Sequence, residues 1–105
     1  MAVRPTTVDV FTVGSHLDGR NVAAVRAEIN DVLATATGDI VIDMAALTLI
    51  DAAGLGMLTA AHLRAERAGR RLLLRNCSKE IRRVLAVTRL NRVLRLDRGN
   101  LELSA

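Results

Sequence analysis

The chain has 105 residues, half of them hydrophobic, and a formal net charge of +4 at pH 7. This length corresponds to a single domain with a small core. The single cysteine, Cys77, excludes an internal disulfide and favours a reducing compartment. The first residues, 1–5, lack the apolar segment of a secretory leader, so we expect a cytoplasmic protein.

Charge is distributed unevenly along the chain. Residues 1–60 contain three arginines and seven acids, a net charge of −4, whereas residues 61–105 contain twelve basic residues and four acids, a net charge of +8. Such asymmetry can mark a nucleic-acid surface. Phe11 is the one aromatic residue, so the chain has no platform on which bases stack. The pattern favours a solvated face or a surface for an acidic protein partner.

The first half of the chain predicts a strand, a helix and a second strand. Residues 8–13 alternate, as in a strand near a sheet edge. After a loop at residues 18–21, with Asn21 as the cap, one apolar stripe predicts a helix that ends at Gly38. That stripe contains Val22, Val25, Ile29, Val32, Leu33 and Ala36. Residues 40–44 are so uniformly apolar that we expect a strand covered on both faces.

The second half predicts two more helices around a buried strand at residues 72–74. A helix at about 53–68 ends at Gly69, and a third helix at 79–88 begins after the cap residue Ser78. Residues 90–96 then return toward the sheet. The side chains expected to point inward are Leu55, Leu58, Ala61, His62 and Ala65 in the first of these helices and Ile81, Val84, Leu85 and Thr88 in the second. Alternating strands and helices predict an α/β layered domain.

The most informative segment is residues 50–58, Ile-Asp-Ala-Ala-Gly-Leu-Gly-Met-Leu. It lies between a strand pattern and a helix pattern, and Asp51 can cap the new helix by accepting hydrogen bonds from first-turn N–H groups. A helix N-terminus also suits a phosphate or carboxylate. A hydroxyl residue there could accept a phosphate, but this chain has alanine at both positions, Ala52 and Ala53.

This segment resembles the signature of the STAS domain, the anti-sigma factor antagonist family, whose usual string is Asp-Ser-Ser/Thr-Gly-Leu-Gly. Asp51, Gly54, Leu55 and Gly56 match, whereas the two alanines depart. Three more segments match in the right order. Residues 13–18 are similar to the family's strand ending Leu-Ser-Gly-Glu-Leu-Asp, with His16 in place of the acid. Residues 40–44 are similar to its central strand, and residues 72–76 are similar to the strand after the signature helix.

The resemblance covers roughly residues 8–97 and implies an α/β fold. We expect residues 1–105 to form a single STAS-like domain, with a mixed, mostly parallel sheet of about four strands and three to four helices packed on it. The family usually has an additional N-terminal strand and a C-terminal helix. Both ends of this chain are short, so we expect these two elements to be reduced or missing.

The resemblance also implies a function, that of a binding module. The module would sequester an anti-sigma factor of the histidine-kinase-like ATPase type and so release a sigma factor. The implied partner-binding residues are Asp18, Asp51, Ala52, Ala53, Gly54 and Leu55. In the family the second hydroxyl of the signature is the regulatory phosphorylation site. Ala53 has that position here, so the site is degenerate, and Thr48 is the next hydroxyl to consider. A homodimer is left open.

Enzyme chemistry has little support in the sequence. His16 and His62 are the only histidines, which with one cysteine argues against a metal site. Ser15, His16 and Asp18 lie too close together in the chain for a catalytic triad. No Gly-Lys-Ser or Gly-Lys-Thr is present, so nucleotide hydrolysis has no motif. We expect no catalytic activity, no metal and no cofactor.

Two other functions stay open. One is a STAS-type accessory subunit of a transporter or signalling assembly, which would hold a partner ATPase. The other is a nucleic-acid adaptor that uses the arginine-rich second half. We expect no membrane insertion, because Asp43 and Asp51 would lie inside the apolar stretch 40–63. Each would cost about 2.5–3.5 kcal/mol near the bilayer centre.

Overall fold

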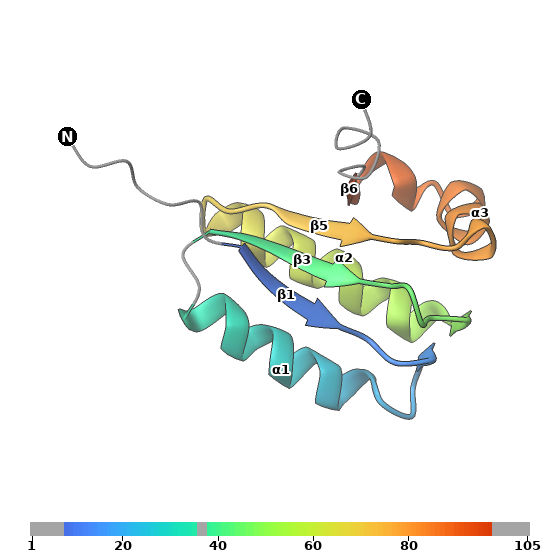
Figure 1. The fold of residues 1–105 in the computed structure, drawn as a ribbon, viewed down its shortest axis with the longest axis horizontal. Coiled ribbons are helices and arrows are strands. Elements are labelled where there is room, and N and C mark those ends of the chain that lie inside the picture. The colour runs from blue at the N-terminus through green and yellow to red at the C-terminus, as the bar shows by residue number, and fades with distance from the viewer. Residues whose placement is uncertain (1–7, 36–37, 98–105) are drawn as a thin grey trace.

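The computed structural model describes residues 8–35 and 38–97 (Figure 1). Strands and helices alternate along the chain, with a short 3-10 helix, η1, before the last strand. In chain order the elements are β1 Val8–Thr12, β2 His16–Leu17, α1 Val22–Thr35, β3 Asp39–Asp43, β4 Leu49–Ile50, α2 Ala52–Arg67, β5 Leu72–Arg75, α3 Lys79–Val87, η1 Leu90–Arg92 and β6 Arg95–Asp97.

The main sheet has four strands in the order β1-β3-β5-β6, and all of its pairings are parallel. Parallel neighbours need a long crossover connection, and here α1, α2 and the α3–η1 segment supply one each. The α/β fold with a four-stranded, mostly parallel sheet is therefore confirmed. The expected loss of an N-terminal strand and a C-terminal helix concerns residues outside the described ranges.

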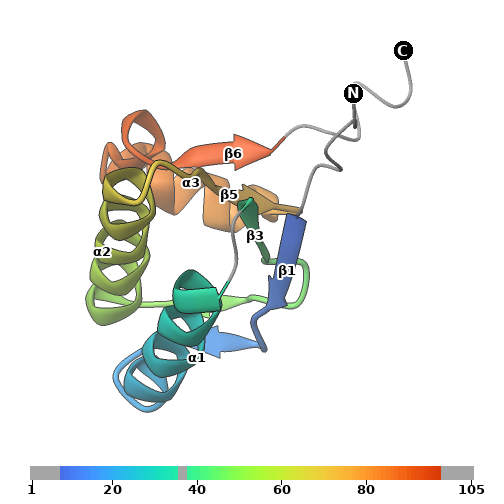
Figure 2. The ribbon, with the colours of Figure 1, turned by 90° about the vertical axis from the view of Figure 1, so that its left-hand side faces the viewer.

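The core lies between the sheet and helices α1 and α2, which cover the same face of it (Figure 2). Ile42 of β3 and Leu74 of β5 occupy paired positions on that face and are almost fully buried. Ile29 of α1 and Leu58 of α2 pack with them in one cluster. Burial of such side chains contributes roughly 1.5–3 kcal/mol each and is the main force that holds the layers together.

The central strand β3 is buried on both of its faces, as its uniformly apolar sequence predicts. Ile42 contributes to the core, and Val41, whose side chain alternates to the opposite face, is also buried. Val41 is paired with Val10 of β1 on one side and Leu73 of β5 on the other. These apolar neighbours help to cover it on the face that α1 and α2 do not reach.

A second, smaller sheet consists of β2 and β4, two residues each, with His16 paired to Leu49 and Leu17 paired to Ile50. β2 lies within residues 13–18, which resemble a strand of the family, whereas the sequence did not predict β4. The pairing is extended by the backbone N–H of Thr48, which donates to the carbonyl of Ser15, and by that of Asp51, which donates to the carbonyl of Leu17. The segments that lead into α1 and α2 are thus held side by side.

The ends of α2 and α3 follow the predicted capping residues. Asp51 caps α2, and Gly69, with a φ of 75°, follows its last turn. Ser78 caps α3 by accepting a hydrogen bond from the N–H of Ile81 at 3.1 Å. These side chains satisfy N–H groups that have no partner inside the helix.

Two expectations about helix residues are wrong. The side chain of Asn21 does not bond to the amides of α1; it accepts a hydrogen bond from the N–H of Asp18 and donates to the carbonyl of His16. Thr88 does not point into the core, because α3 ends at Val87 and Thr88 is exposed as the C-cap. Its hydroxyl donates back to the carbonyl of Val84 at 2.8 Å.

Candidate partner-binding site

The side chain of Asp51 joins the two loops of the small sheet. Its Oδ1 accepts a hydrogen bond from the N–H of Gly54 at 3.0 Å, which caps α2. Its Oδ2 accepts one from the N–H of Gly19 at 3.3 Å, in the loop before α1. One carboxylate therefore fixes the start of α2 against a loop that is 32 residues away in the chain. This confirms that Asp51 acts as a cap.

Gly54 allows the first turn of α2 to lie directly against β2. A β-carbon at this position would be 2.2 Å from the carbonyl oxygen of Leu17 and 2.9 Å from the Cγ1 of Ile50. Real side chains do not tolerate such distances, and the first of these atoms belongs to the backbone and cannot rotate away. Gly54 is therefore required to position the loop and the helix start.

Asp18 and Arg20 form an ion pair beside this loop. The guanidinium donates from Nε and Nη2 to the Asp18 carboxylate at 2.9–3.2 Å, and the Arg20 backbone N–H donates to the same group at 3.0 Å. These hydrogen bonds, led by those of the Arg20 side chain, hold the pKa of Asp18 below its usual value. The Asp18 side chain is only 10% exposed, and that of Arg20 is 68% exposed.

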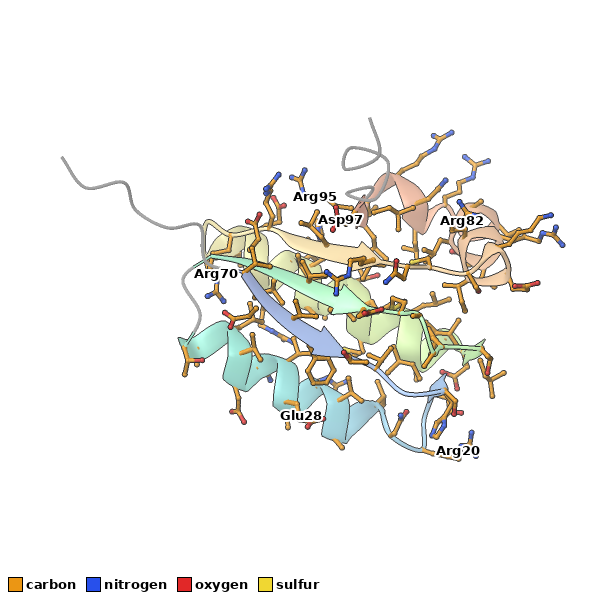
Figure 3. All side chains as sticks on the ribbon, viewed as in Figure 1. Arg20, Glu28, Arg70, Arg82, Arg95 and Asp97 are labelled. Atoms are coloured by element: carbon orange, nitrogen blue, oxygen red, sulfur yellow. The ribbon has the colours of Figure 1, made fainter. Side chains whose placement is uncertain are left out.

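The arginine, and not the acid, is therefore the charged group that this loop presents to solvent (Figure 3). Asp51 also lies near enough to raise the pKa of Arg20, after the larger effect of Asp18. The Asp18–Arg20 pair in the loop before α1 is thus close to electrically neutral. The buried Asp18 carboxylate fixes the position of the exposed Arg20 guanidinium.

The outward face of α2 is smooth and free of charge over its first three turns. Ala52, Ala53 and Gly56 are exposed on this face, and Leu63, further along the helix, is 45% exposed. Their spacing places them on one side of a helix with 3.6 residues per turn, opposite the buried Leu58. Leu49 of β4, directly before the helix, is 53% exposed. We call Leu49, Ala52, Ala53, Gly56 and Leu63 the α2 face.

Gly56 is a glycine that the fold does not need. A β-carbon at this position would meet nothing within 4 Å, and its backbone is helical. Glycine in the interior of a helix destabilises it by roughly 0.5–1 kcal/mol relative to alanine. The lack of a side chain at this exposed point keeps the surface flat, so that another molecule could approach the helix backbone closely.

The sequence-predicted site residues fall into two groups. Asp51, Ala52 and Ala53 are exposed and adjacent, whereas Asp18 and Gly54 are buried and Leu55 is half-buried. The sequence did not single out Leu49 or Leu63, because nothing in the residue type distinguishes an exposed leucine from a core leucine. Arg20 was not singled out either, because its ion pair with Asp18 depends on side-chain geometry. The match of Gly56 to the signature was noted, but its open surroundings were visible only in three dimensions.

The remaining hydroxyls near the site differ in environment. Thr48 is exposed, and its Oγ1 donates to the carbonyl of Ser15 at 3.1 Å. The Oγ1 of Thr59 donates to the carbonyl of Leu55 at 2.9 Å and lies within α2. Neither occupies the first turn of the helix, where Ala53 lies.

Within residues 8–35 and 38–97, no three His, Cys, Asp or Glu side chains come together as potential metal ligands. The helices described there include none that is long and apolar enough to span a membrane.

A family model described as "Mlab, STAS domain" matches residues 2–96 of the 105. The chain belongs to the STAS domain family. The resemblance drawn from residues 50–58 and the three other segments is therefore confirmed. No curated protein matches this STAS domain.

Solved structures share the fold of this STAS domain at low sequence identity. A candidate anti-sigma factor antagonist of Thermotoga maritima has a TM-score of 0.77 and 20% identity, covering 95% of this chain and 91% of its own. The anti-sigma factor antagonist SpoIIAA in its unphosphorylated form has a TM-score of 0.74 and 20% identity, covering 97% of this chain and 90% of its own. A sulfate transporter family protein of Wolinella succinogenes has a TM-score of 0.73 and 21% identity, covering 90% of this chain and 80% of its own. Anti-sigma factor antagonists and a sulfate transporter family protein thus share this architecture.

Proposed function

We propose that this STAS domain is an anti-sigma factor antagonist-like binding module. It would bind an anti-sigma factor of the kinase-like ATPase type through the α2 face and the Asp51 loop, and so release a sigma factor. The module would act in the cytoplasm. It would do so without catalysing a reaction, because binding alone accomplishes the exchange of partners.

The observation that carries this proposal is the α2 face itself. Exposed leucines at 49 and 63 flank a strip of alanine and glycine, and Gly56 is kept free of a side chain without structural need. Burial of the leucines would supply hydrophobic energy, and the small residues would let a partner's backbone approach closely. Arg20, held by Asp18, would provide a polar contact at the rim of the interface.

Control by phosphate at position 53 has no chemical basis in this chain. A phosphate adds about −1.5 to −2 charges and would lie beside Asp51, where repulsion and bulk oppose binding. Ala53 has no oxygen to accept it. We therefore propose that the site is degenerate and the α2 face is permanently competent to bind, unless the chain is regulated elsewhere.

A second candidate is an accessory subunit that holds the ATPase of a transport assembly. It is favoured by the similarity to the Wolinella sulfate transporter family protein, whose fold match is nearly as good as that of the antagonists. The same α2 face would serve this function, since both candidates require a protein partner. They differ in what the partner does.

A pull-down from the native host, followed by mass spectrometry, tests the proposal. The proposal predicts a kinase-like anti-sigma factor that is retained by the wild-type chain and lost with Leu49→Glu. Ala23→Glu is the control, because Ala23 is exposed on α1, outside the α2 face. A transport ATPase lost with Leu49→Glu would favour the second candidate. Nucleic acid, or a partner indifferent to Leu49→Glu, would contradict both.

A further inference from the structure

A second surface lies on α3 and η1, separate from the α2 face. It consists of the exposed basic residues Lys79, Arg82, Arg83, Arg89 and Arg92 together with Val87 and Val93, and we call it the α3–η1 surface. Glu80 is the one acid in residues 79–93, so five basic residues and one acid give a net charge of +4. Nitrogen-tipped side chains project outward around α3 (Figure 3).

The arginines of this surface differ from four others in the fold. Arg20, Arg71, Arg75 and Arg95 each form an ion pair with a carboxylate. Within the described residues, the side chains of the arginines at 82, 83, 89 and 92 form no ion pair and no hydrogen bond. Their guanidinium groups are therefore available to a partner.

Arg89 has an unfavourable backbone conformation for its residue type. Its φ is 64°, in the left-handed region, directly after the C-cap Thr88 of α3. Glycine is the residue that usually occupies this position, because a β-carbon there is strained by about 1–2 kcal/mol. This conformation turns the chain from α3 into η1, the short helix that contains Arg92.

Two valines give the surface an apolar part. Val87 is 77% exposed and Val93 is 42% exposed. The larger apolar side chains of α3, Ile81 and Leu85, are buried in the core. A membrane-binding helix needs large apolar side chains that enter the lipid, and this surface has none to offer. Nucleic acid would place phosphates against the valines, and residues 79–93 contain no aromatic side chain that could stack on bases.

We propose that the α3–η1 surface is a docking site for an acidic, partly apolar segment of a second protein. Carboxylates of that segment would pair with the guanidinium groups, which suit bidentate carboxylate recognition. Aliphatic side chains of the segment would cover Val87 and Val93. This contact is independent of the α2 face, so one STAS domain could hold two protein segments at once.

NMR titration of the full chain tests the proposal. The probe is a synthetic peptide in which glutamates alternate with leucines, and its control has glutamines in place of the glutamates. We expect the glutamate peptide to shift the amide signals of α3 and η1, and the glutamine peptide to bind at least tenfold more weakly. Arg82→Glu/Arg83→Glu should reduce affinity for the glutamate peptide at least tenfold.

A charge-matched variant separates a specific surface from general basicity. Arg26→Glu/Arg67→Glu changes the net charge equally at exposed positions of α1 and α2, and it should change the affinity less than threefold. Equal losses in the two double variants, or shifts spread over all helices, would overturn the proposal. So would tighter binding of phosphatidylserine vesicles or duplex DNA to the same residues, which would assign the surface to lipid or nucleic acid.

Discussion

A methyl group added to Gly54 would lie 2.2 Å from the carbonyl oxygen of Leu17, whereas one added to Gly56 would meet nothing within 4 Å. The two glycines are one helical half-turn apart, and both match the family signature. The first is required by the fold, because it lets α2 pack against β2. The second is not required by the fold, because it is exposed on α2 with open space around it.

Gly54→Ala and Gly56→Ala should change stability in opposite directions. We expect Gly54→Ala to lower the free energy of unfolding by about 1–3 kcal/mol or more through overpacking against Leu17. Gly56→Ala should raise it by about 0.5–1 kcal/mol, because alanine favours the helix. Chemical denaturation of both variants is the measurement. Destabilisation by Gly56→Ala would show that the fold needs this glycine after all.

The unfolding free energy should fall in acid because three carboxyls have lowered pKa values. The Arg20 side chain is the main cause for Asp18, the Arg71 side chain for Asp39, and the N–H of Ala45 for Asp43. A carboxyl whose pKa is lowered in the folded state stabilises the fold, and this contribution is complete above the unfolded-state pKa of about 3.9. The contribution is lost as the pH falls through the folded-state pKa.

Denaturation midpoints should thus be level between about pH 7 and 5 and decline below about pH 4. Arg20→Gln should flatten part of this decline, since the pKa of Asp18 then rises toward that of the unfolded chain. A midpoint that increases on acidification would contradict the assignment of these ion pairs.

The chain should remain unphosphorylated when it is incubated with a cognate anti-sigma kinase and ATP. Ala53 lacks a hydroxyl, and Thr48 and Thr59 lie outside the first turn of α2. Intact-mass spectrometry is the measurement, and the expected spectrum shows only the unmodified mass. A stoichiometric gain of one phosphate would contradict this, and Thr48→Ala would then test the exposed threonine.

Affinity for DNA should be weak, without sequence preference, and strongly reduced by salt. The unpaired arginines can contact phosphates, but the described elements contain a single aromatic residue, Phe11, and no separate recognition helix. A gel-shift assay at about 150 mM salt, near physiological ionic strength, is the check. Nanomolar binding to one sequence would revive the nucleic-acid adaptor as the function.

The sequence predicted most of the architecture because the apolar patterns of its long elements are clear. The uniform run at residues 40–44, the stripe of α2 and the caps Asp51 and Ser78 all correspond to what the structure contains. The resemblance of residues 13–18 to a family strand included β2, but β4 was missed because two residues cannot show a pattern. Asn21 was misassigned because its side chain bonds back to Asp18 and His16 in the preceding loop and not forward to the amides of α1.

The site was predicted at the level of its loop and not of its surface. Asp51 follows from the signature, but the neutralisation of Asp18 by Arg20 depends on side-chain geometry. Leu49 and Leu63 are exposed, and neither belonged to a predicted inward stripe, but nothing in the sequence marked them as part of a binding surface. Exposed apolar residues of this kind are set by the three-dimensional arrangement, since the same residue types fill the core.

The most direct test of the proposed partner site compares Ala53→Glu with Ala23→Glu. Both alanines are exposed, and each is the second residue of its helix: Ala53 in α2 and Ala23 in α1. A glutamate in the first turn should therefore be tolerated equally well by both helices. Isothermal calorimetry with the captured ATPase should show at least tenfold weaker binding for Ala53→Glu, or about 1.4 kcal/mol, and unchanged binding for Ala23→Glu. Equal affinities for wild-type and Ala53→Glu would contradict the α2 face as the interface.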